Sequence, residues 1–220
     1  RYTLQTLTRA VARDRASRLD PEVVRTAFDD DELWTSNADG PSPPHALLYT
    51  GGIQSRLYAG DPQGAWDYAQ RHKTLERRLR FRDRLSRALY FSTRAQAAIA
   101  RGDSLGLKEA KRAIKKLAPL DVPPAKGLTL LAQAGIAGVR GQADEMSVLL
   151  RRALETLQAG EMDMHAAVAQ LRLGQATPET QSGQELIGSA TAFMRRNGVV
   201  DEHRLANAYA PGCASRGDLN

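Results

Sequence analysis

The 220-residue sequence is poor in cysteine, in aromatic residues and in long apolar runs. Its only cysteine, Cys213, excludes an internal disulfide, so we expect a reducing compartment, the cytoplasm. Aromatic residues make up 5% of the chain and β-branched residues are scarce, which favours helices over sheets. No apolar run approaches the length of a membrane-spanning helix and no signal-peptide core is present, so we expect no membrane insertion of this segment.

Motifs of the common catalytic and metal sites are missing as well. The four histidines are far apart and lack HExxH or cysteine partners, so zinc chemistry has no support. The sequence has no GxSxG, no Walker loop and no GxGxxG. Its acidic run at 29–32 is typical of a solvated face, since four adjacent carboxylates on a helix point several ways. We expect no cofactor, no metal and no catalytic residue, and this chain alone is not an enzyme.

A turn that the chain repeats indicates its architecture. The stretches GDPQG at 60–64 and GDSLG at 102–106 each follow an apolar run and open another. A glycine after a helical run is a common helix stop, because it adopts the left-handed conformation without steric cost. Asp61 and Asp103 then stand where a carboxylate caps the free amides of the next helix. The repeated stretch therefore predicts a tight turn between two helices.

Two looser versions of this turn follow, at Gly141 and Gly174. The four stops, at 60, 102, 141 and 174, are 42, 39 and 33 residues apart, which brackets the period of tetratricopeptide-like helical hairpins. Such hairpins cannot bury their apolar faces alone and therefore stack. The sequence predicts an all-α fold, a right-handed α-solenoid of stacked antiparallel hairpins.

The breaks in the pattern divide the chain. Proline-rich segments interrupt it at 38–44 and 119–124. We expect an N-terminal helical segment at 1–41 that belongs to the same solenoid, a repeat domain at 42–212 and a C-terminal tail at 213–220. The expected helices are 4–19, 21–36, 44–59, 62–79, 83–101, 104–118, 125–140, 144–159, 163–173, 182–197 and 201–209.

The first helix of each hairpin would line a concave surface of the kind that binds extended peptides or partner domains. Counted back from the turn glycines, Thr50 and Gln54 occupy the same offsets as Ser92 and Gln96. A repeated hydroxyl and amide suit hydrogen bonding to a peptide backbone. Ordinary exposed helix positions would give the same pattern, and the third hairpin does not continue it. These four residues are the candidate partner-binding site.

A basic helical face gives a second candidate site. The chain carries a net charge of +6, and cations concentrate in RRLRFRDRLSR at 77–87 and KEAKRAIKK at 108–116. Such a face would bind phosphate groups, with steep salt dependence because each contact releases counterions. Only one aromatic residue is interleaved and carboxylates dilute the stripe, so we do not expect nucleic acid as the partner. The residues are Arg77, Arg80, Arg84, Arg87, Lys108, Lys111, Arg112, Lys115 and Lys116.

Two stretches carry a family resemblance. Between 55 and 100 the chain has a Leu-Tyr-x-Gly-Asp turn, an Ala-Trp pair and an Arg-rich, Leu-rich helix. Between 193 and 212 it has an aromatic-Met pair, Gly-Val, a short helical stretch and Ala-Pro-Gly. In this order they resemble the C-terminal helical-repeat region of bacterial eukaryotic-like serine/threonine protein kinases. The resemblance covers about 44 to 212, and the first 40 residues depart from it.

The resemblance implies a kinase domain elsewhere in a longer polypeptide, and a start at Arg1 rather than Met agrees with such a piece. A protein kinase needs a Gly-rich loop, a strand lysine, HRD and DFG, and none occurs here. We therefore expect a sensor or scaffold module for signal transduction. Its partner would be a protein or peptide, with the kinase domain of the same polypeptide as one candidate. The sequence leaves the oligomeric state, the ligand and the signal open.

Overall fold

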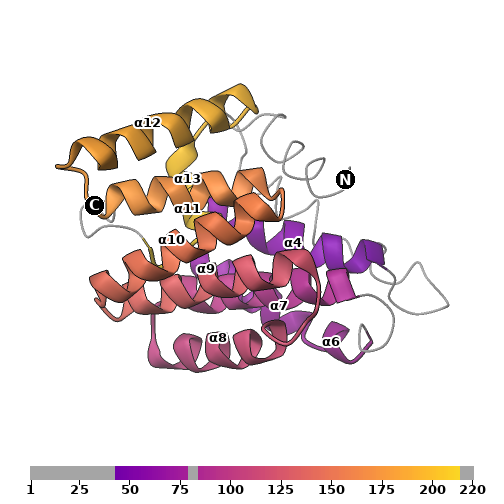
Figure 1. The fold of residues 1–220 in the computed structure, drawn as a ribbon. Coiled ribbons are helices and arrows are strands. Elements are labelled where there is room, and N and C mark those ends of the chain that lie inside the picture. Colours follow the sequence, from indigo (N-terminus) through magenta and orange to yellow (C-terminus); the bar gives the residue numbers. More distant parts are fainter. Residues whose placement is uncertain (1–42, 79–83, 214–220) are drawn as a thin grey trace.

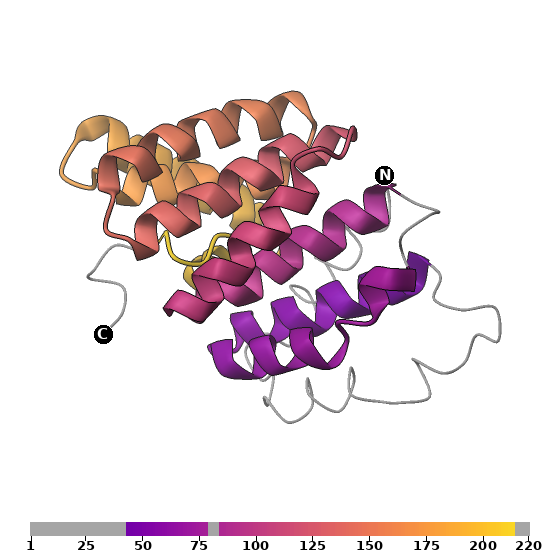
Figure 2. The same cartoon turned by 90° about the horizontal axis from the view of Figure 1, so that it is seen from below.

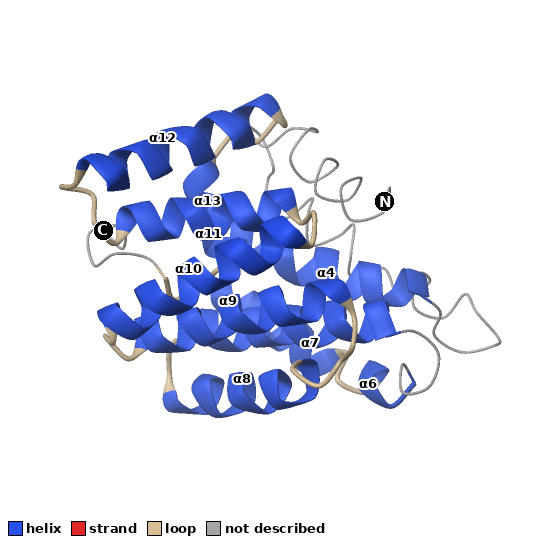
Figure 3. Ribbon diagram, viewed as in Figure 1, coloured by secondary structure: helices blue, strands red, loops and turns tan. Residues whose placement is uncertain are grey.

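The computed structural model describes residues 43–78 and 84–213, and the elements it contains there are all helices (Figures 1 and 3). The expected all-α class is confirmed for this part of the chain. The N-terminal segment at 1–41 lies outside the described residues, and so do its two expected helices. The helices are α4 (Pro43–Tyr58), α5 (Pro62–Arg71), α6 (Leu75–Arg78), α7 (Arg84–Ala100), α8 (Ser104–Leu117), α9 (Pro123–Val139), α10 (Ala143–Ala159), α11 (Asp163–Gln175), α12 (Gln181–Arg196) and α13 (Glu202–Tyr209).

Neighbouring helices pack as hairpins. The pairs α4–α5, α7–α8, α9–α10 and α11–α12 each contact along the chain, and α4 packs on α7, α7 on α9, and α10 on α11 (Figure 2). The described helices are thus arranged as a helical repeat would arrange them. The short helix α13 breaks this order, because it packs back against α4, α7, α11 and α12.

The turn that the sequence repeats has the expected geometry. Gly60, Gly102 and Gly141 have φ angles of +81°, +75° and +72°, in the left-handed region. Asp61 and Asp103 cap the helices that follow, each accepting an amide hydrogen bond at 2.7 Å, from Gly64 and Gly106. The bond from Gly106, with a second from Arg101, holds the pKa of Asp103 below its usual range. These contacts confirm the predicted glycine stop and aspartate cap.

Replacing Asp61 with alanine should lower the free energy of unfolding by about 1 kcal/mol, because the Gly64 amide loses its acceptor. Asp61→Asn keeps a side-chain oxygen at the same place and serves as the control, with most of the stability retained. Urea unfolding followed by circular dichroism measures both variants. Equal losses for alanine and asparagine would contradict the capping role.

The fourth expected stop, at Gly174, is wrong. Gly174 lies inside α11, where a Cβ would stand 2.7 Å from the carbonyl oxygen of Gly183 and 2.8 Å from Cγ1 of Ile187. This glycine therefore allows α12 to approach closely. The turn comes later, at 176–180, and Thr180 caps α12 by accepting from the Gly183 amide at 2.9 Å.

The helix expected at 62–79 is also interrupted. It ends at Arg71 and resumes as α6 after a turn at 72–74. Within this turn the amides of Lys73 and Leu75 bond to carbonyls three residues back, at 3.2 Å and 3.1 Å. The tightened turn places Leu75 in the core, with 4% of its surface exposed.

A buried ion pair ties three helices together. The Arg94 guanidinium on α7 donates to Oε1 of Glu109 on α8 at 2.6 Å and to the carbonyl oxygen of Ala69 on α5 at 3.3 Å. The two charged side chains are 3% and 12% exposed. Burial raises the pKa of Glu109, but the hydrogen bond and charge of Arg94 outweigh it, so the pKa lies below its usual range. The pair therefore stays charged at neutral pH.

Candidate functional site

The structure brings the four candidate partner-binding residues together where α4 packs on α7. Thr50, Ser92 and Gln96 are buried, and Gln54 is half-buried. Gln54 Nε2 donates to Gln96 Oε1 at 3.5 Å, although 42 residues separate the two. Ser92 Oγ donates within its own helix, to the carbonyl oxygen of Leu89 at 3.1 Å. Of the two pairs at equal offsets, Gln54 and Gln96 thus meet, whereas the hydroxyl of Thr50 accepts from Thr93 at 3.3 Å.

A segment near the end of the chain contacts Gln96, one of these residues. We call residues 199–213 the C-terminal segment: it contains α13 and the four residues that follow. We call the surface of α4, α7, α9 and α11 that it contacts the inner face (Figures 1 and 2). Gln96 Nε2 donates to the backbone carbonyl oxygen of Tyr209 in this segment at 3.0 Å. A partner could reach Gln96 only by displacing the segment.

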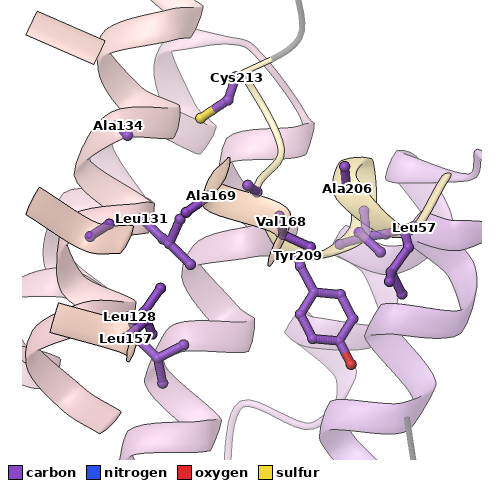
Figure 4. Packing of buried hydrophobic residues seen from close by; sticks show 14 of the residues in the cluster. Leu57, Leu128, Leu131, Ala134, Leu157, Val168, Ala169, Ala206, Tyr209 and Cys213 are labelled. Carbon is purple, nitrogen blue, oxygen red and sulfur yellow. The ribbon is translucent and has the colours of Figure 1, made fainter. Parts of the chain in front are cut away.

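Apolar side chains contribute to this contact. In the C-terminal segment Leu205, Ala206, Ala208, Tyr209 and Ala210 are buried in the same core cluster as the helices of the stack. Figure 4 shows Ala206 and Tyr209 beside Leu57 of α4 and Val168 of α11. The packed chain extends to Cys213, which is 1% exposed.

Two glycines of α9 let the backbone of the segment lie directly on the helix. A Cβ at Gly135 would stand 2.4 Å from the carbonyl oxygen of Pro211, and one at Gly138 would stand 2.0 Å from that of Gly212. Gly212 itself has φ of +80°. We call the Gly135–Gly138 surface the glycine notch. Only residues without a side chain permit this approach.

Gly138→Ala should therefore lower the free energy of unfolding by about 1 to 3 kcal/mol, since the new methyl group meets a backbone oxygen. Gly188→Ala is the matched control, because Gly188 also lies inside a helix and nothing stands within 4 Å of its Cβ position. The control should be neutral or stabilising, as alanine is the better helix former. Urea unfolding compares the two, and equal stabilities would contradict the notch.

Polar side chains of α11 and α12 also contact α13. The buried Arg172 of α11 donates to Oδ1 of Asn207 and, at 2.8 Å, to Oε1 of Gln175. Gln175 Nε2 lies 3.2 Å from Nδ1 of His203. Arg195 of α12 pairs with Glu202. Side chains of α11 and α12 therefore orient α13 in the inner face.

A buried histidine faces the aromatic ring of the segment. The rings of His165 on α11 and Tyr209 lie 4.8 Å apart in an edge-to-face arrangement. Burial lowers the pKa of His165 to about 4, so its ring is neutral at pH 7. His165 thus acts as a packing residue for Tyr209.

The basic face is divided in the structure. Lys108, Lys111 and Lys115 lie exposed along α8. Other cations of this face contact carboxylates: Arg112 with Glu109 at 3.2 Å, Lys116 with Glu76, and Arg84 with Asp121 at 3.8 Å. On α7 Arg87 is half-buried. The side chain of Arg77, and all of Arg80, lie outside the described part of the chain.

An open hollow of about 580 Å³ lies beside the loop between α8 and α9. Lys126 and Arg152 stand on its polar side, together with Asp121. The hydroxyl of Thr129 at this hollow is buried and has no hydrogen-bond partner among the described residues. The apolar lining residues are Ala118, Leu120, Val122, Pro123 and Leu130.

In the ranges 43–78 and 84–213, no group of three or more His, Cys, Asp or Glu side chains is placed to hold a metal ion. No helix within these ranges has both the length and the apolarity to cross a membrane. No protein-family model, no curated protein and no solved structure matches the chain.

Proposed function

We propose that this chain is a non-catalytic interaction module, a right-handed tetratricopeptide-like α-solenoid that binds a protein or peptide on its inner face. One observation carries the proposal: the inner face already binds a polypeptide segment, by apolar contacts and by a side-chain hydrogen bond to its backbone. The bond from Gln96 to the carbonyl oxygen of Tyr209 is a contact that an incoming peptide can reproduce.

We propose further that the module is the C-terminal regulatory region of a bacterial serine/threonine protein kinase and works in the cytoplasm. The resemblance of residues 55–100 and 193–212 supports this parentage. The partner would then be the kinase domain of the same polypeptide or a protein that the kinase recruits. Binding of the partner on the inner face would then require displacement of the C-terminal segment.

The test is a pull-down with this chain as bait, against the separate kinase domain and against lysate of the source cell, at low and high salt. We expect a protein to be captured at both salt concentrations, because an apolar face depends weakly on ionic strength. Gln54→Lys should reduce capture, since it places a charge beside Gln96 at the edge of the inner face. Capture of nucleic acid alone, lost at high salt, would contradict the proposal.

A second candidate function is phospholigand or nucleic-acid binding by the basic face. The observation that favours it is the row of exposed lysines on α8, spaced along one side of the helix. Replacing Lys108, Lys111 and Lys115 with glutamine should abolish such binding and remove its salt dependence. The carboxylates that pair with Arg112, Lys116 and Arg84 make this the weaker candidate.

A further inference from the structure

The contacts of the C-terminal segment define a site with three parts. The first part is the surface of α4 and α11 on which α13 packs, with the ring of Tyr209 against that of His165. The side chain of Gln96 fixes the backbone where the helix ends. The glycine notch of α9 then receives the turn at Pro211 and Gly212. Together these parts recognise a short helix followed by a turn of small residues.

We propose that the C-terminal segment is an internal ligand of the inner face, and that the partner binds there with a segment of the same kind. This inference rests on the proposed function. The partner segment would carry small residues on one helix face, an aromatic residue at its end, an acceptor oxygen for Arg172 in the place of Asn207, and a turn narrow enough for the glycine notch.

The contacts between neighbouring hairpins do not involve the C-terminal segment. Each hairpin packs on the next through α4–α7, α7–α9 and α10–α11, and none of these contacts passes through α13. The segment joins α12 through a turn in which Gly198 has φ of +85° and Val200 is 58% exposed. Rotation about this turn could therefore move the segment away from the inner face while the hairpins remain packed.

The segment also gains its order from docking. Its helix has eight residues, which is shorter than an isolated helix needs to be stable in water. Two buried polar side chains of the stack, Gln96 and Arg172, bond to it. These side chains would face water or a new acceptor once it leaves, so a replacing partner must supply acceptor oxygens. It must also supply apolar side chains, because Leu205, Ala206 and Tyr209 of the segment are buried in the core cluster.

Cys213 reports the release directly, because it is the only thiol of the chain and lies buried at the end of the segment. The experiment labels Cys213 of the full chain with a slow thiol reagent between 0 M and low molar urea, and compares the opening free energy with that of global unfolding. We expect opening to need less free energy than unfolding and to depend weakly on urea.

A synthetic peptide of residues 199–213, with Cys213→Ser, is then added in trans. It should raise the labelling rate saturably, by about tenfold or more, because it stabilises the chain with its own segment released. The same peptide with Tyr209→Ala is the control and should have little effect. In the chain, Gly138→Ala should raise the labelling rate, and Gly188→Ala should leave it unchanged.

Labelling that matches global unfolding in free energy and urea slope, with no effect of the peptide, would overturn the internal-ligand proposal. The result is separable from the proposed function. Partner capture without any change in labelling would leave the interaction module standing and reject the internal ligand. If the peptide accelerates labelling but no protein is captured, the internal ligand stands and the interaction module is rejected.

Discussion

Replacing Arg94 with methionine should lower the free energy of unfolding by about 3 to 5 kcal/mol, the largest effect expected of a single substitution here. Methionine keeps much of the apolar stem but removes the guanidinium that contacts Glu109, Ala69 and Tyr90. Glu109, with a side chain 12% exposed, would remain without its buried partner. A buried carboxylate that loses its counter-charge is costly, which is why the loss exceeds that of a surface pair.

Arg112→Met is the matched control, because Arg112 contacts the same Glu109 from the surface, at 3.2 Å and with a side chain 61% exposed. Its loss should be about 1 kcal/mol or less. In the double variant Arg94→Met/Glu109→Gln, we expect the loss to be smaller than the sum of the single losses, since neither charge is then left alone. Urea unfolding at pH 7 measures the parent chain, Arg94→Met, Arg112→Met, Glu109→Gln and the double variant. Equal losses for Arg94→Met and Arg112→Met would contradict the buried pair.

The second large effect is a loss of stability in acid that depends on His165. Burial lowers the pKa of His165 from 6.5 to about 4 in the folded chain. Between these values the unfolded chain binds a proton that the folded chain does not. The free energy of unfolding therefore falls as the pH drops below about 6.5. Below about 4 His165 causes no further loss, because it is then protonated in both states. The full contribution is about 3 kcal/mol, from 1.36 kcal/mol per pKa unit.

His165→Phe isolates this contribution, because it keeps an aromatic ring against Tyr209 and cannot bind a proton. The variant should lose less stability than the parent chain between pH 7 and pH 4.5, by about 2 to 3 kcal/mol. All other titrating groups are common to both proteins, so they cancel in the comparison. Parallel pH profiles for the two proteins would contradict a neutral, buried His165.

Local sequence signals predicted the all-helical class and two of the turns of the described residues. Glycine followed by aspartate identified the turns at Gly60 and Gly102 correctly, because the left-handed φ and the cap are both properties of the residues themselves. At Gly174 the same argument was wrong. The residue after it, Gln175, continues the helix, and the glycine is needed for contact with α12. A glycine alone does not distinguish a helix stop from a close approach between helices.

The partner-binding role of the four candidate residues stays a prediction. Gln54 and Gln96 occupy equal offsets before their turn glycines, and the structure places their side chains 3.5 Å apart. Periodicity says which residues of a repeat lie together, but not what covers them. The covering segment follows from tertiary packing that no local pattern contains. A signal was present in the small residues around Ala210–Gly212 and in the glycines of α9, but their meeting depends on the whole stack.

Native-state hydrogen exchange, read at the amides of α13 and of α9, tests whether the C-terminal segment leaves the inner face while the hairpins stay folded. If the inner face is a binding surface held by its own C-terminal segment, the α13 amides should exchange through an opening smaller than global unfolding, while those of α9 remain protected. Adding the captured partner or the trans peptide should speed exchange in α13 and leave α9 unchanged. Exchange of α13 and α9 together, only through global unfolding and regardless of partner or peptide, would show instead that the segment is a fixed part of the core.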